Sequence, residues 1–220
     1  MAGTYANMQT RIADDLLNSA VSAAQIQNAI LTSIAYYDSE RLYFNQKTAT
    51  FNTVAAQEYY GASDLADIPN IVSLDNALLT VNGYKRKLVT VDFGIMDDEQ
   101  NGYVNGPPYW LAYYGQQIRL YPNPDAVYTT TLSYQYKFAA LSAGTDTNAW
   151  MVDGEELIRQ SAKKRIALDI LFDDAMAARC ASLEDQALTS LQQETRRKLP
   201  NKQLAIPAMV QGRRFNIFQG

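Results

Sequence analysis

Residues 128–138 read Tyr-Thr-Thr-Thr-Leu-Ser-Tyr-Gln-Tyr-Lys-Phe, and in this stretch two kinds of side chain alternate. The set that begins at Tyr128 includes Leu132, Tyr134 and Phe138, whereas the residues between are Thr, Ser, Gln or Lys. A period of two is that of a β-strand, because successive side chains point to opposite faces of a sheet. The stretch therefore predicts a strand with one face toward a core.

Two turn sequences upstream of this strand predict β-hairpins. Asn82-Gly83 lies between two β-prone runs, and both positions tolerate the positive φ of a type I′ turn. Gly115-Gln116 separates a second pair of such runs, and residues 122–125, Pro-Asn-Pro-Asp, make a rigid turn before the alternating strand. Tight hairpins join antiparallel strands, so we expect residues 48–150 to form an antiparallel β region.

On both sides of this region the apolar residues recur at helical spacing. We expect helices over about 5–17 with Thr4 as cap, over about 22–44 with Ser22 as cap, from Asp153 as N-cap, and over about 182–199, where Pro200 ends the last one. The residues expected on their buried faces are Met8, Ile12 and Leu16; Ile26, Ile30, Ile34 and Tyr37; Ile158, Ala162, Ile166 and Ile170; and Leu183, Ala187, Leu188 and Leu191.

The sequence thus predicts an α+β fold in three parts. Residues 1–47 and 151–199 form a four-helix-type body, and residues 48–150 form an inserted antiparallel β domain. Residues 200–220 follow the last helix as an extended C-terminal arm, because they show no helical period and contain Pro207 and Gly212.

Composition excludes several kinds of chemistry. The 220 residues contain no histidine and a single cysteine, Cys180, which excludes His-based catalysis, His-ligated metal sites, intrachain disulfides and multi-Cys clusters. The first residues have no basic start followed by an apolar run, and no stretch approaches the roughly 20 apolar residues of a membrane span. We therefore expect a soluble protein that stays where it is made, with no membrane partner.

A search for catalytic motifs finds no phosphate-binding loop, nucleophile elbow or dinucleotide fingerprint. The acidic run Asp97-Asp98-Glu99 lacks the spacing of a calcium loop, and we interpret it as a turn or helix end. Asp173-Asp174 and Glu184-Asp185 are expected on exposed helix faces, and Cys180 in a helix seam. The prediction is a protein that is not an enzyme and has no cofactor and no metal.

The C-terminal arm differs from the rest of the chain in charge. Residues 48–150 carry 10 acidic and 5 basic side chains, whereas residues 196–220 carry 6 basic side chains and no acidic one. The arm is also apolar, so we interpret it as a segment that becomes ordered on a partner; the alternatives are a final strand of its own domain and a nucleic-acid-binding tail. The candidate partner-binding residues are Arg196, Arg197, Lys198, Leu204, Ile206, Arg213, Arg214, Phe215 and Phe218.

The β region is rich in tyrosine, with Tyr109, Trp110, Tyr113 and Tyr114 close together before the second hairpin. Two interpretations stay open. The rings can fill the inner face of a small sheet, or they can form a contact surface, since tyrosine supplies contact area at low entropic cost.

Several segments resemble one protein family. Residues 4–16, Thr-Tyr-Ala-Asn-Met-Gln-Thr-Arg-Ile-Ala-Asp-Asp-Leu, residues 25–30, residues 36–45, and residues 113–125, Tyr-Tyr-Gly-Gln-Gln-Ile-Arg-Leu-Tyr-Pro-Asn-Pro-Asp, resemble the head-to-tail adaptors of tailed bacteriophages, in particular of those with short tails. The resemblance spans most of residues 4–175.

This resemblance implies a structural protein of the virion neck, assembled in the cytoplasm of the host bacterium. It implies a homo-oligomeric ring, usually of twelve copies, that sits under the portal, extends the DNA channel and carries nozzle and fibre proteins, while genomic DNA passes without specific binding. It also implies that the arm reaches the portal. Two other classes remain open: a tail-fibre-like or carbohydrate-recognition module that uses the Tyr-rich sheet, and a nucleic-acid-binding packaging factor.

Overall fold

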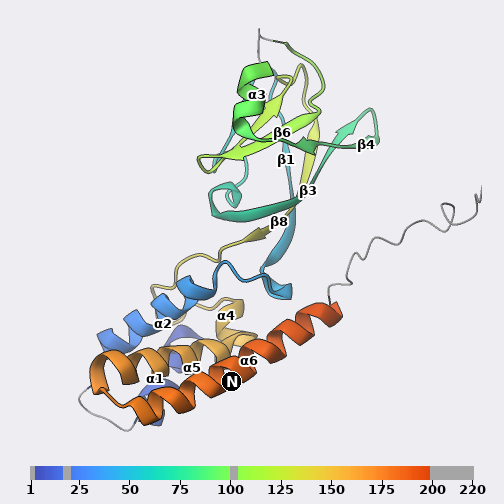
Figure 1. Cartoon of the computed structure of the whole chain (residues 1–220). Coiled ribbons are helices and arrows are strands. Elements are labelled where there is room, and N and C mark those ends of the chain that lie inside the picture. Colours follow the sequence, from blue (N-terminus) through green and yellow to red (C-terminus); the bar gives the residue numbers. More distant parts are fainter. Residues whose placement is uncertain (1–2, 17–20, 100–103, 199–220) are drawn as a thin grey trace, which may run out of the picture.

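The structure is a computed structural model that describes residues 3–16, 21–99 and 104–198. It has the mixed α+β fold predicted from the sequence, with the strands gathered at one end of the molecule and all helices except α3 at the other (Figure 1). The helices are α1 (Tyr5–Leu16), α2 (Ala23–Tyr37), α3 (Phe93–Glu99), α4 (Ala149–Val152), α5 (Glu155–Ile166) and α6 (Asp174–Lys198).

The first two helices begin at the predicted caps. The Thr4 hydroxyl accepts a hydrogen bond from the backbone N–H of Asn7 at 3.3 Å. Ser22 forms a capping box with Gln25, in which the Ser22 hydroxyl accepts from the Gln25 N–H and the Gln25 side chain accepts from the Ser22 N–H. Each arrangement satisfies backbone N–H groups that have no partner within the helix.

The second helix is shorter than predicted, because α2 ends at Tyr37 and not near Phe44. The buried side chain of Asn45 holds the chain in a turn instead. Its amide donates to the carbonyl of Glu40 at 2.6 Å, and its oxygen accepts from the N–H of Leu42 at 3.0 Å. Side-chain bonds of this kind compete with the helical backbone bonds. A short 3₁₀ helix, η1 (Tyr43–Asn45), then leads into the strands.

The predicted starts of the last two helices were wrong. Asp153 ends the short helix α4, and the residue before α5 is Gly154, which provides no side-chain cap. The final helix begins at Asp174, eight residues before Ser182, because the Asp173 carboxylate accepts from the N–H of Met176 at 2.9 Å, as an N-cap residue does. A π-helical segment, η3 (Ala167–Leu171), continues α5 toward this turn.

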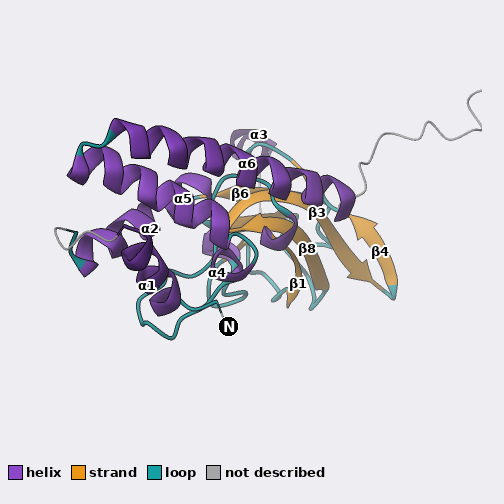
Figure 2. Ribbon diagram, turned by 90° about the horizontal axis from the view of Figure 1, so that it is seen from below, coloured by secondary structure: helices purple, strands orange, loops and turns teal. Residues whose placement is uncertain are grey.

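The predicted apolar stripes form the core between the helices. Helix α5 lies between α2 and α6, and α1 packs on α2 and α5 (Figure 2). The stripe residues buried there are Met8, Ile12, Ile26, Ile30, Tyr37, Ile158, Ala162, Ile166 and Leu191, with Leu16, Ile34, Ile170, Ala187 and Leu188 partly buried against them. Trp150 of α4 is fully buried in the same core and makes an edge contact with Phe44 at 5.0 Å between ring centroids.

The strands form two four-stranded sheets. The first has the order β1-β8-β3-β4, from β1 (Gln46–Asn52), β8 (Thr129–Tyr136), β3 (Ile71–Val81) and β4 (Tyr84–Lys87). The second has the order β2-β7-β6-β5, from β2 (Tyr59–Tyr60), β7 (Gln117–Tyr121), β6 (Trp110–Tyr114) and β5 (Val89–Thr90). Both predicted hairpins are confirmed, with φ of 49° and 80° at Asn82 and Gly83 and of 58° and 61° at Gly115 and Gln116.

The expectation of a purely antiparallel β region needs one correction. Strands β5 and β6 pair in parallel, with Val89 opposite Trp110. Helix α3 lies in the connection between them, and a parallel pair requires such a crossover. A two-residue strand has too few positions to show a period, which is why the sequence pattern did not reveal it.

The alternating stretch 128–138 supplies the centre of the β core. Thr130, Leu132 and Tyr134 of β8 are completely buried, and Ala77 of β3 lies opposite Leu132. Gln135 points the other way and is also buried. Its side-chain amide is satisfied there, since it donates to the carbonyls of Ser39 at 3.1 Å and Glu40 at 2.9 Å. This face of β8 is therefore covered by the turn that follows α2.

Gly154 offers a direct test of packing at the start of α5. A Cβ atom at this position would lie 2.7 Å from Cε3 and 3.3 Å from Cα of the buried Trp150. Gly154→Ala is therefore expected to destabilise the protein by about 1–3 kcal/mol through overpacking. Gly106→Ala is the matched control, since its Cβ would meet nothing within 4 Å. Urea unfolding of both variants checks this, and equal stabilities would contradict it.

Candidate interaction surfaces

The C-terminal end of α6 places the first three of the candidate arm residues. Arg196, Arg197 and Lys198 are all exposed, and Lys198 in addition has two side-chain contacts within the chain. The Lys198 ammonium lies 2.7 Å from a carboxylate oxygen of Glu194 and 3.6 Å from the centroid of the Tyr43 ring. The hydrogen bond to Glu194 raises the pKa of Lys198, so this end of the helix stays cationic.

The same helix end is tied to the segment that leads into the strands. The hydroxyl of Thr195 accepts from the N–H of Tyr43 at 3.2 Å, and the Tyr43 hydroxyl donates to Asp153 at 2.9 Å. The described end of α6 therefore lies next to η1, where the chain passes from helices to strands. The remaining candidate residues, Leu204, Ile206, Arg213, Arg214, Phe215 and Phe218, lie outside the residues that the structure describes.

The four candidate aromatic residues before the second hairpin do not form one surface. Trp110 and Tyr113 are partly buried on opposite faces of β6, and the Tyr113 hydroxyl donates to the carbonyl of Ile68 at 2.9 Å. Tyr109 and Tyr114 are exposed by 40% and 66%. The ring of Tyr114 stacks on Phe93 of α3 at 4.6 Å between centroids. Trp110 and Tyr113 therefore pack against the core, whereas for the exposed Tyr109 and Tyr114 a contact surface stays a prediction.

A buried arginine explains the position of α3 and of the acidic run. The Arg119 guanidinium on β7 is 4% exposed; it pairs with Glu58 and, at 3.0 Å, with Asp97 of α3. It also lies 5.0 Å from the centroid of the Phe93 ring. The acidic run is thus a helix end, as predicted, and one of its carboxylates has a structural partner. Sequence reasoning missed this group, because its members are far apart in the chain and share no local pattern.

A second buried group joins three helices. Glu184 of α6 is 2% exposed, accepts a hydrogen bond from the Tyr37 hydroxyl at 2.7 Å, and pairs with Lys164 of α5. The expectation that Glu184 lies on an exposed face was wrong, although Asp185 is exposed as predicted. Burial by itself raises the pKa of Glu184, but the hydrogen bonds from Lys164 and Tyr37 outweigh it, so the pKa lies below its usual value. The carboxylate at the centre of this group is buried, whereas the Lys164 side chain is 29% exposed.

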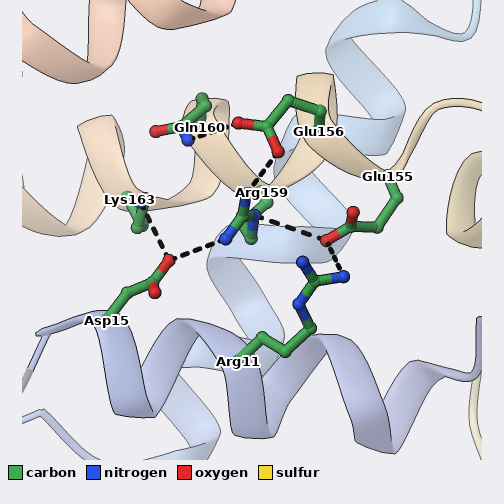
Figure 3. A network of polar contacts seen from close by, with 7 residues as sticks. All are labelled: Arg11, Asp15, Glu155, Glu156, Arg159, Gln160 and Lys163. Atoms are coloured by element: carbon green, nitrogen blue, oxygen red, sulfur yellow. Dashed lines mark hydrogen bonds and ion pairs between the residues drawn. The ribbon is translucent and has the colours of Figure 1, made fainter. Parts of the chain in front are cut away.

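A third polar group connects α1 to α5 (Figure 3). At its centre the Arg159 side chain, 16% exposed, contacts Asp15 at 3.0 Å, Glu155 at 3.3 Å and also Glu156. At its edges Lys163 contacts Asp15 at 3.0 Å, Arg11 contacts Glu155 at 3.0 Å, and the Gln160 amide donates to Glu156 at 2.6 Å. All charges here are paired within the chain, which indicates a structural role.

No metal-binding geometry is found among residues 3–16, 21–99 and 104–198, since no three His, Cys, Asp or Glu side chains there are placed to hold an ion. Cys180 is buried in the helix seam, as predicted, and burial raises the pKa of its thiol, which makes the reactive thiolate rarer. Within the described helices, none has both the length and the apolar character needed to cross a membrane.

Comparison with protein families supplies the identity. No curated protein matches the chain. The family model described as SU10 adaptor protein matches residues 3–204, which include every described helix and strand and the start of the arm as far as Leu204. The match thus covers the two regions together and agrees with the resemblance noted in the sequence. The chain belongs to the SU10 adaptor protein family, a family of structural phage proteins that act as head-to-tail adaptors.

Proposed function

We propose that this chain forms a ring between the capsid portal and the tail of a phage, in the neck of the virion. The observation that carries the proposal is the family match over residues 3–204. The copy number of twelve, the extension of the DNA channel and the attachment of nozzle and fibre proteins follow from the resemblance described above. On this proposal the protein acts by assembly and has no catalytic step.

The C-terminal arm is proposed to bind the portal. The whole chain has a net charge of −4 and residues 196–220 contribute +6, so the remaining residues carry −10. A cationic, apolar segment attached to an acidic body is suited to an acidic and partly apolar groove on another protein. Ordering on contact costs conformational entropy, and this cost is compensated only when the partner fits. The exposed Arg196 and Arg197 would begin this contact.

The rest of the chain is proposed to act as two domains. Residues 1–47 and 151–199 would form the helical domain that builds the ring, and residues 48–150 the β domain that faces outward or toward the tail. Tyr109 and Tyr114 would be available there for contacts with tail proteins or a neighbouring subunit, and the partly buried Trp110 and Tyr113 would contribute mainly by supporting them. Carboxylates that line the channel would repel DNA phosphates, so that the genome passes without binding.

Deletion of residues 200–220 tests the proposal. We expect the truncated protein to lose co-sedimentation with the portal protein of its phage, because the arm supplies most of the contact. A variant with the same arm residues in scrambled order is the control, since it keeps charge and composition but not the pattern. Undiminished portal binding by the truncated protein would contradict the proposal, and affinity in a glycan array would favour a carbohydrate-recognition module instead.

A further inference from the structure

The outer side of α2 differs from that of the other long helices because α2 contains no charged residue. None of the residues from Leu16 to Tyr37 is Asp, Glu, Lys or Arg, whereas α1, α5 and α6 all carry several. The inner side of α2 is used, since Ile26, Ile30 and Tyr37 are buried in the core. Among the exposed positions of α2, which also include Ala23, Thr32 and Tyr36, we call Ala24, Gln27, Asn28, Leu31 and Ala35 the α2 face.

The α2 face has the composition of an interface and not of a solvated helix. Exposed helix surfaces normally carry charged side chains, whereas the centre of a protein–protein interface is depleted of them. Leu31 is 37% exposed at the middle of the face, and the alanines on either side of it permit close approach of another helix. Asn28 supplies an amide group that can exchange hydrogen bonds with a polar partner, whereas the Gln27 amide donates to the side-chain oxygen of Gln9 on α1 at 3.3 Å.

A second surface of matching character lies on α6. The α6 face consists of Ser182, Asp185, Gln186, Thr189, Ser190 and Gln193, which together line a shallow hollow on the exposed side of the helix. Asp185 is its one charged member. The other members carry hydroxyl or amide groups that can donate and accept hydrogen bonds without the desolvation cost of a full charge.

The two faces point away from each other. Helix α5 lies between α2 and α6, and each of the outer helices turns its buried side toward it (Figure 2). Their exposed sides are therefore on opposite sides of the helical layer. Two different surfaces in this arrangement can join one copy to the next head to tail, which generates a closed ring when the rotation per copy is suitable.

We propose that the α2 face of one copy packs against the α6 face of the next copy. The contact would continue the order α2, α5, α6 into the neighbour as one layer of helices. A second copy is the occupant that the charges favour, since the α2 face has no carboxylate to attract the cationic arm, and the near-neutral α6 face matches a neutral partner. The inference rests on the ring of the proposed function and names the surfaces that close it.

The test uses one cation on each face of the full-length protein. We expect Leu31→Arg and Gln186→Arg each to weaken self-association at least tenfold in sedimentation velocity, because neither position has a carboxylate three or four residues away, so each would leave an arginine without a partner in the contact. Ala35→Arg, a second change on the α2 face, should behave like Leu31→Arg. Ala13→Arg, at an exposed position of α1 outside both faces, is the matched control and should assemble like the unmodified protein.

A mixture of the two variants distinguishes this arrangement from a symmetric dimer. Each variant keeps one intact face, so the mixture should form one-to-one pairs that grow no further. The inference is overturned if the unmodified protein stays monomeric, if Leu31→Arg and Ala35→Arg assemble normally although circular dichroism shows them folded, or if the mixture gives no pairs. Failure of the proposed function would appear separately, as portal binding that persists without residues 200–220.

Discussion

Replacement of Glu184 by alanine is expected to destabilise the protein by about 2–4 kcal/mol, at or somewhat below the cost of removing one partner from a fully buried ion pair, because the Lys164 side chain is 29% exposed. The carboxylate is 2% exposed, so its removal leaves the Lys164 ammonium and the Tyr37 hydroxyl without their shared acceptor. Urea unfolding at pH 7 measures the loss. Glu194→Ala is the matched control on the same helix, because Glu194 is 43% exposed in its pair with Lys198 and should cost less than about 1 kcal/mol.

The same residue predicts a dependence of stability on pH. Because the pKa of Glu184 is lower in the folded protein than in the unfolded chain, its contribution is complete above the ordinary glutamate pKa of about 4.3. The contribution is lost as the pH falls through the folded pKa. Glu184→Gln should therefore be less stable than the unmodified protein at pH 7, and the difference should shrink on acidification. A difference that grows below pH 4 would contradict the assignment.

Arg159→Met is expected to cost about 2–3 kcal/mol, somewhat less than a fully buried pair because the side chain is 16% exposed. The change removes the cation shared by Asp15, Glu155 and Glu156 and leaves Lys163 and Arg11 as the remaining partners of two of them (Figure 3). Repulsion among these carboxylates should separate α1 from α5. In this variant, amide hydrogen exchange should therefore accelerate more in α1 than in α6.

Arg11→Met is the control for this network. Arg11 is 53% exposed and contacts Glu155 alone, so its replacement should change the unfolding free energy by less than about 1 kcal/mol. Equal effects of the two changes would show that the position of Arg159 at the centre of the network has no energetic importance.

Local signals gave correct predictions where the structure depends on local physics. Asn82-Gly83 and Gly115-Gln116 form hairpins because their backbones adopt positive φ, which few residue types tolerate. Helix α2 begins directly after Ser22 because the Ser22 hydroxyl accepts a hydrogen bond from the N–H of Gln25, three residues later. The predicted end of α2 was wrong because it does not depend on a local signal. No residue type near Tyr37 stops a helix, and the side-chain bonds that compete with the helical backbone bonds come from Asn45.

The interaction surfaces were predictable only in part. The charge of the arm and the tyrosines of the β region stand out in the sequence, but the sequence does not say that Tyr113 supports the core while Tyr114 is exposed. The lack of charge in α2 is a signal that the sequence does contain. Its meaning depends on which side of the helix is buried, and on the position of α6 across α5.

The sequence by itself determined the order of helical and β segments, both hairpins, the apolar stripes of the helical core, and the absence of histidine chemistry, because periodicity, turn chemistry and composition act over a few residues. The tertiary structure alone decided that Glu184 is buried, that Arg119 binds Asp97, and that β5 runs parallel to β6. Each of these depends on partners from distant parts of the chain. The burial and pairing of a side chain are properties of what packs against it, which no local pattern records.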